Sequence, residues 1–198
     1  MADRTKLECV TKFIDEANSA DPNVDVVDGV EGPKELIYGR RMMGWVERLN
    51  AEASDELKIA ARAQHICRWE VPRSEYPEGK AGYYAWRTYL YGYHAAKAGE
   101  LMREAGYPEE SIERVRVIMD KKNLRKDSDT QTLEDAAALV FLENHLGEFS
   151  GRDDMDEEKT IDILRKTWGK MSEAGHEAAL TLVLSAESAA LVEKALQG

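Results

Sequence analysis

Cysteine and proline are scarce in this chain, and long apolar runs are missing. The 2 cysteines, Cys9 and Cys67, form no CxxC pair, so we interpret them as free thiols of a reducing compartment. No apolar stretch approaches the roughly 20 residues that a membrane-spanning helix needs. The opening MADRTKLECVTKF lacks the apolar run and cleavage site of a signal peptide. These absences predict a cytoplasmic protein with no membrane partner.

Positive charge is also in short supply. Lys and Arg number 27 against 38 Asp and Glu, which gives a net charge of −11. Proteins that bind nucleic-acid polymers draw their affinity from an excess of Lys and Arg around the phosphates. We therefore expect no nucleic-acid polymer as a partner, whereas a local basic pocket for a small anion is compatible with this composition.

The apolar pattern is helical along nearly the whole chain. There are 198 residues, 43% of them hydrophobic, only 5 prolines, and no sustained alternation of β-branched residues. We predict an all-α, compact single domain of about seven to nine helices. The expected helices span about 4–18, 33–50, 55–70, 81–105, 108–121, 129–146, 157–171 and 174–196, the last broken near Ser185. Residues 20–33 are expected to form a loop, because Pro, Asp and Gly interrupt the pattern there.

Two of the histidines lie near arginine and aromatic residues. In the segment AARAQHICRW, spacings of three and four predict that Arg62, His65 and Trp69 share one helix face. Similar spacing aligns His94 with Arg87 on the next helix. A structural role, in which each histidine only donates or accepts hydrogen bonds inside the fold, is the alternative.

Asp135 lies in an otherwise apolar helical segment. Burying a carboxylate is costly unless it is paired, hydrogen-bonded or bound to metal. Asp135 is therefore either a ligand or the partner of a cation such as Arg62 or Arg68.

Two short segments resemble motifs of the HD-domain superfamily of metal-dependent phosphohydrolases. LKIAARAQHI, residues 57–66, is similar to the helix that carries the family's His-Asp pair, and EDAAALVFL, residues 134–142, is similar to the helix with its last Asp ligand. The resemblance covers about residues 33–146. The whole chain also resembles a bacterial and fungal family described as a domain of unknown function.

The resemblance implies an HD-like topology, with a core at about 33–146 and C-terminal helices at about 157–198 packed on it. It also implies one divalent ion, Fe, Mn or Zn, held by His65, His94 and Asp135, in a hydrolase of a small phosphorylated or nucleotide-like substrate. Here His94 takes the place of an accessory histidine. The chain departs from the family at two core ligands. Tyr38, Gly39 or Arg40 stands in place of the opening histidine, and Ile66 replaces the Asp of the pair.

These departures support a second hypothesis of a different class, a metal-free HD-like binding or regulatory protein. Its pocket for a small anion would be lined by arginine and histidine, because guanidinium groups bind phosphate and carboxylate bidentately. Under either hypothesis the expected anion-binding residues are Arg62, Arg68, Arg73, Arg87, Lys121 and Lys122. The amphipathic C-terminal segment packs either inward or against a second copy, so a homo-oligomer is left open.

Overall fold

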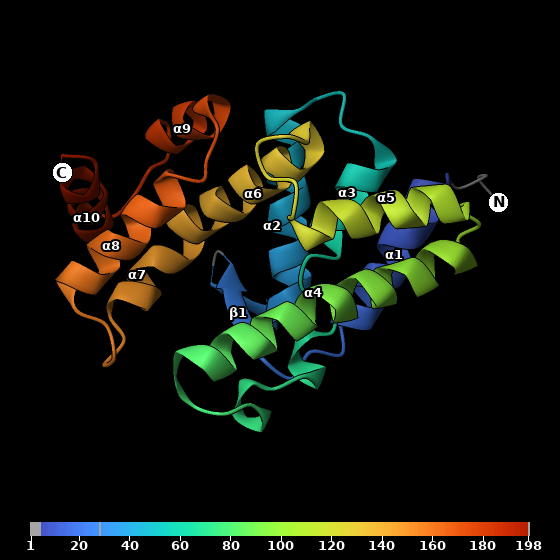
Figure 1. Ribbon diagram of the computed structural model, residues 1–198, viewed down its shortest axis with the longest axis horizontal. Coiled ribbons are helices and arrows are strands. Elements are labelled where there is room, and N and C mark those ends of the chain that lie inside the picture. The colour runs from blue at the N-terminus through green and yellow to red at the C-terminus, as the bar shows by residue number, and fades with distance from the viewer. Residues whose placement is uncertain (1–4, 28, 198) are drawn as a thin grey trace. The chain divides into compact units, whose positions relative to one another are not determined.

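The computed structural model describes residues 5–27 and 29–197, and these ranges are predominantly helical (Figure 1). The all-α prediction is confirmed, with ten α-helices in the described ranges. The chain divides into two compact units, Met1–Leu133 and Glu134–Gly198. Organisation as a single domain with HD-like topology stays a prediction.

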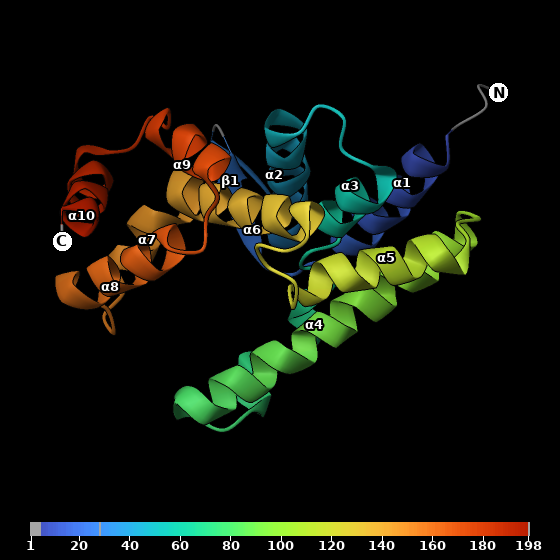
Figure 2. The ribbon, with the colours of Figure 1, turned by 45° about the horizontal axis from the view of Figure 1, so that its top comes forward.

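The first unit is a set of helices with one small β-hairpin. Its elements are α1 (Lys6–Asn18), β1 (Val24–Val27), β2 (Val30–Pro33), α2 (Lys34–Leu49), α3 (Asp55–Arg62), the 3-10 helices η1 (Arg68–Glu70) and η2 (Arg73–Glu75), α4 (Gly79–Glu104), α5 (Glu109–Asp120) and the start of α6 (Ser128–Val140). Helix α4 lies alongside α5, as both ribbon views show (Figures 1 and 2), and α2 and α5 pack against α3.

Local sequence explains where several of these helices begin. Thr5 and Glu8 form a reciprocal capping box at the start of α1, and the Ser54 side chain accepts the Leu57 N–H at the start of α3. The apolar faces then close over fully buried side chains such as Met42 and Ile59. Caps set the ends of the helices, and burial of one face holds them together.

The expected loop at 20–33 contains the β-hairpin, so that expectation is wrong. Strands β1 and β2 pair antiparallel, with Val27 opposite Val30, and Gly29 between them has a φ of +78°. The sequence signal is the Asp-Gly dipeptide between valines, which is typical of hairpin turns. It was missed because the hairpin valines are exposed, so no apolar face alternates with a polar one.

The third expected helix, about 55–70, is also wrong in its second half. Helix α3 ends at Arg62, and Cys67 takes a left-handed conformation with a φ of 51° before η1 begins. Two side chains from other helices hold this turn: Asn18 Oδ1 accepts the Cys67 N–H at 3.0 Å, and His94 Nδ1 donates to the Ile66 carbonyl at 2.8 Å. Arg62, His65 and Trp69 therefore do not share a helix face.

The second unit contains the rest of α6 and four more α-helices. A π-helix, η3 (Phe141–His145), joins α6 to α7 (Leu146–Ser150), and α8 (Glu157–Trp168), α9 (Glu173–Leu180) and α10 (Ala186–Leu196) follow. The predicted break near Ser185 is confirmed, because Ser185 is the N-cap of α10. Helix α8 packs against α10. Within the ranges that the structure covers, every helix is too short or too polar to cross a bilayer.

Asn18 offers a direct test of the turn after α3. Its side chain is 1% exposed and also donates to the Glu35 carbonyl, so Asn18→Ala leaves buried backbone groups without partners. We expect a loss of about 1–3 kcal/mol in the free energy of unfolding, measured by urea denaturation followed by circular dichroism. Asn123→Ala, at an exposed position, is the matched control. Equal stability of the two variants would contradict this role.

Asp127 predicts how the first unit responds to acid. The Arg114 guanidinium hydrogen-bonds its carboxylate at 2.5 Å and lowers the pKa of Asp127 to about 2. A lowered pKa in the folded state gives stability that is present above about pH 4 and lost as the pH falls towards 2. We expect Asp127→Asn to lose about 1 kcal/mol at pH 7, after allowance for solvent screening, and to show a shallower stability loss between pH 4 and 2 in urea titrations. If Asp127→Asn lost as much stability between pH 4 and 2 as wild type does, the role given to Asp127 would be refuted.

Candidate functional site

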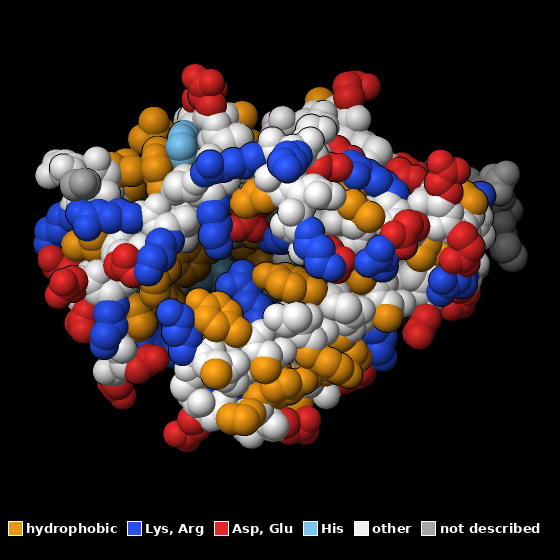
Figure 3. All heavy atoms as spheres, viewed as in Figure 1, with side chains coloured by type: hydrophobic (Ala, Val, Ile, Leu, Met, Phe, Trp, Pro, Cys, Tyr) orange, Lys and Arg blue, Asp and Glu red, His pale blue; other side chains and the backbone are white. Residues whose placement is uncertain are grey.

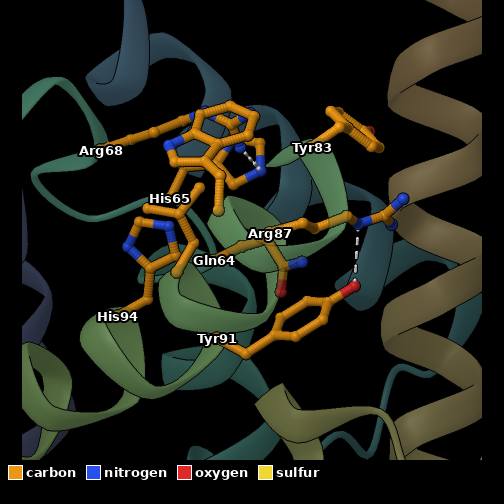
Figure 4. Close-up of a pocket in the computed structure, with 9 residues that line it drawn as sticks. Gln64, His65, Arg68, Tyr83, Arg87, Tyr91 and His94 are labelled. Carbon is orange, nitrogen blue, oxygen red and sulfur yellow. Dashed lines mark hydrogen bonds between the residues drawn. The ribbon is translucent and has the colours of Figure 1, made fainter. Parts of the chain in front are cut away.

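A cavity of about 230 Å³ opens in the first unit between α4 and the turn that follows α3 (Figure 4). It combines cations, aromatic rings and neutral polar groups. The residues that line it are Gln64, His65, Arg68, Tyr83, Trp86, Arg87, Leu90, Tyr91 and His94. The structure thus brings together four of the residues singled out in the sequence: His65, His94, Arg68 and Arg87.

His65 is fixed in orientation on three sides. Its ring stacks on Tyr38, with centroids 4.1 Å apart and planes 8° apart. Its Nδ1 lies 3.2 Å from Glu35 Oε2, and its Nε2 lies 2.9 Å from Arg68 NH1. Because a guanidinium only donates, Nε2 must accept, and Nδ1 then carries the proton that it donates to Glu35. Both ring nitrogens of His65 are therefore engaged within the fold.

Glu35 is a site residue that sequence analysis did not single out. It is 8% exposed, and burial raises the pKa of its carboxyl to about 7, against an opposing effect of Arg68. Its backbone N–H donates to Asp21 Oδ2 at 2.9 Å. An acidic residue in the first turn of a helix is ordinarily explained by the helix dipole, so its position carries no signal of this role.

Arg68 contributes a cation to the lining of the cavity. Its guanidinium lies over the Trp86 ring, 4.7 Å from the centroid, and Trp86 Nε1 in turn donates to the Val71 carbonyl at 2.9 Å. In the part of the chain that the structure describes, no carboxylate lies within ion-pair distance of Arg68. Its guanidinium therefore contacts an aromatic ring and a histidine, while the Glu35 carboxylate interacts with it electrostatically through His65 without forming an ion pair.

His94 lies deeper in the same cavity and is neutral. Its side chain is 3% exposed, and burial lowers its pKa to about 3. Since Nδ1 donates to the Ile66 carbonyl, Nε2 carries the lone pair. Neither His94 Nε2 nor the Gln64 Oε1 atom has a hydrogen-bond partner among residues 5–27 and 29–197.

Arg87 and Tyr91 form another wall of the cavity. Arg87 Nε donates to the Tyr91 hydroxyl at 3.0 Å, and both side chains come from α4 (Figure 4). Arg87 adds a second cation to the lining, while Tyr83 and Trp86 supply apolar surface. The cavity is accordingly both cationic and aromatic.

The remaining predicted anion-binding residues do not line this cavity. Arg62 holds both oxygens of Asp15 at 2.7 Å, and Arg73 donates to the carbonyls of residues 76 and 77. Lys122 pairs with Asp120 at 3.0 Å, and Lys121 is the left-handed C-cap of α5. Positive charge alone could not separate these residues from Arg68, because acidic partners are abundant in the sequence. Figure 3 shows this mixing of cationic and anionic side chains across the face in view.

Asp135 belongs to the second unit, where its carboxylate accepts hydrogen bonds from Ser172, the N-cap of α9. Its carboxylate is 3% exposed and accepts the backbone N–H of Ser172 at 2.9 Å and the Ser172 hydroxyl at 2.5 Å. Gly175 allows this approach, since a Cβ there would lie 2.8 Å from the Asp135 Cγ. The hydrogen bonds expected for a buried carboxylate are thus present.

Within the described ranges, no three His, Cys, Asp or Glu side chains gather as a metal site. The metal role of His65, His94 and Asp135 therefore stays a prediction.

Comparison with known proteins identifies one family. Searches of the curated proteins and of the solved structures gave no match. The family described as "Domain of unknown function (DUF4202)" matches residues 8–192, which is nearly the whole chain. The protein therefore belongs to the DUF4202 family.

Proposed function

We propose that the protein is a metal-free binding or regulatory protein that holds a small anion in the cavity of its first unit. The observation that carries this proposal is the Arg68 guanidinium, which lines the cavity without a carboxylate partner in the described ranges. In a chain with a net charge of −11, a partly buried arginine would ordinarily pair with an acid, as Arg62 does with Asp15. An anion from solution supplies the missing partner.

The surrounding contacts preorganise Arg68 for this role. Glu35 orients His65 through Nδ1, and His65 Nε2 accepts one N–H of Arg68. Trp86 supports the flat face of the guanidinium. An arginine has five N–H donors, and His65 uses one of those of Arg68. The contacts with His65 and Trp86 therefore orient the guanidinium and leave most of its donors for a ligand. Preorganisation of this kind lowers the entropic cost of binding.

The size of the cavity limits the ligand. Pockets for drug-sized molecules are commonly about 300–1,000 Å³, and this cavity of about 230 Å³ is smaller. We therefore propose a small phosphorylated, sulfated or carboxylated molecule, with Arg87 as the second cation that faces it.

Arg68→Gln tests the proposal because it removes the charge and keeps a polar, though shorter, side chain. A charge-assisted hydrogen bond contributes about 1.5–3 kcal/mol, so we expect inorganic phosphate and sulfate to bind at least about tenfold more weakly. Isothermal titration calorimetry at low ionic strength measures this. Arg68→Lys should fall between the two, since an ammonium keeps the charge and loses the bidentate fork.

Arg103→Gln is the matched control. Arg103 is exposed and pairs with Glu109 away from the cavity, so its loss should leave phosphate affinity unchanged. Equal phosphate affinity in wild type and Arg68→Gln would refute the proposed function.

A second candidate is the HD-like hydrolase with a reduced metal site. The observation in its favour is the pair of histidines, His65 and His94, whose ring centroids lie 5.9 Å apart, together with the unpartnered Nε2 of His94. The donor set as arranged fits an ion poorly. The Nε2 of His65 already accepts from a cation, and both Asp135 oxygens accept from Ser172. These contacts favour anion binding over a metal-dependent hydrolase.

Elemental analysis of protein purified without added metal separates the two candidates. Under the anion proposal we expect no stoichiometric Fe, Mn or Zn, and a melting temperature that rises with phosphate even in the presence of a chelator. About one metal ion per chain, lost in His65→Ala, would favour the hydrolase instead.

A further inference from the structure

Two residues that line the same cavity as Arg68 each carry a buried acceptor atom without a partner in the described residues. Gln64 Oε1 and His94 Nε2 belong to side chains that are 8% and 3% exposed. Figure 4 shows both side chains at the cavity, one from the turn after α3 and one from α4. A buried polar atom that stays unsatisfied is costly, so two in one small cavity indicate that something with hydrogen-bond donors belongs there.

The geometry settles that His94 presents an acceptor. Its Nδ1 must donate, because the Ile66 carbonyl 2.8 Å away only accepts. In a neutral imidazole the other nitrogen then carries the lone pair. The dianionic group of a phosphate monoester, a sulfate ion and a carboxylate, however, have no hydrogen-bond donor. Such an anionic group therefore cannot satisfy His94 or Gln64.

We infer that the ligand is a small organic anion that also carries alcohol groups, such as a polyol phosphate, a small sugar phosphate or a hydroxy acid. Its anionic group lies against Arg68, and its hydroxyls donate to Gln64 Oε1 and His94 Nε2. This inference rests on the proposed function and names the class of its ligand. A hydroxyl suits this cavity because it donates one hydrogen bond and still accepts others, and the cavity volume of about 230 Å³ requires a short carbon chain.

A matched pair of ligands isolates the hydroxyls. Propyl phosphate and glycerol 3-phosphate have the same chain length and charge, and both are dianions at pH 8, above the second phosphate pKa of about 6. Calorimetry on the full chain should give glycerol 3-phosphate at least about tenfold tighter binding, as expected when two buried acceptors gain donors. Propanoate and glycerate form the equivalent carboxylate pair. An advantage seen with either pair supports the inference and identifies the anionic group.

Two variants test the acceptor atoms themselves. Gln64→Met keeps the length of the side chain and removes the oxygen. His94→Asn keeps a donor for the Ile66 carbonyl and removes the distal nitrogen. In each we expect the preference for the hydroxylated ligand to fall below about threefold, while affinity for the hydroxyl-free ligand stays within about twofold of wild type. Gln197→Met, at an exposed position, is the control and should keep the full preference.

The outcomes separate this inference from the proposed function. If both members of each pair bind with equal affinity, and Arg68→Gln removes that binding, the role of the hydroxyls is overturned and anion binding stands. A preference that persists in both Gln64→Met and His94→Asn would also overturn it. If none of these ligands nor inorganic phosphate binds, both the proposed function and this inference fail.

Discussion

The hydrogen bond from His94 Nδ1 to the Ile66 carbonyl is the interaction on which the candidate site depends. It ties α4 to the turn after α3, at a carbonyl that a continued helix would have used internally. Asn18 completes the arrangement by accepting the Cys67 N–H. Because the chain turns there, His65 and Arg68 face α4. In a continued helix they would lie on the surface of α3. The same bond places the proton of His94 on Nδ1 and the lone pair on Nε2, so one contact both holds the turn and sets the tautomer.

Arg62 and Arg68 show why position in the fold decides what an arginine does. They are six residues apart in the sequence, on either side of the turn. Arg62, at the end of α3, meets Asp15 from α1 and forms a bidentate pair. Arg68, beyond the turn, meets a histidine and an indole ring. Bidentate pairing uses up much of one guanidinium, whereas aromatic stacking leaves the edge of the other open to a ligand.

Much of the helical framework could be predicted, because caps and apolar periodicity are local. Ser54 caps α3 close to the expected start at residue 55, the expected break near Ser185 is where α10 begins, and Gly106, with a φ of +81°, follows α4. The turn at residues 63–67 could not be predicted, because it contains neither glycine nor proline and is held by side chains from α1 and α4. His65 and His94 do line one cavity, but the helix face assumed for His65 does not exist.

The cavity differs from a simple cation cluster because its deepest groups are neutral acceptors. Under the proposed function Arg68 alone does not discriminate among anions, since a guanidinium binds phosphate, sulfate and carboxylate through the same fork. Discrimination must come from groups that some ligands satisfy and others leave buried and unpaired. A site built around such groups rejects an analogue that lacks the matching hydroxyl far more strongly than an apolar wall rejects a missing methylene. In the proposed site His94 and Gln64 are the groups that discriminate among ligands, and Arg68 is the group that attracts them.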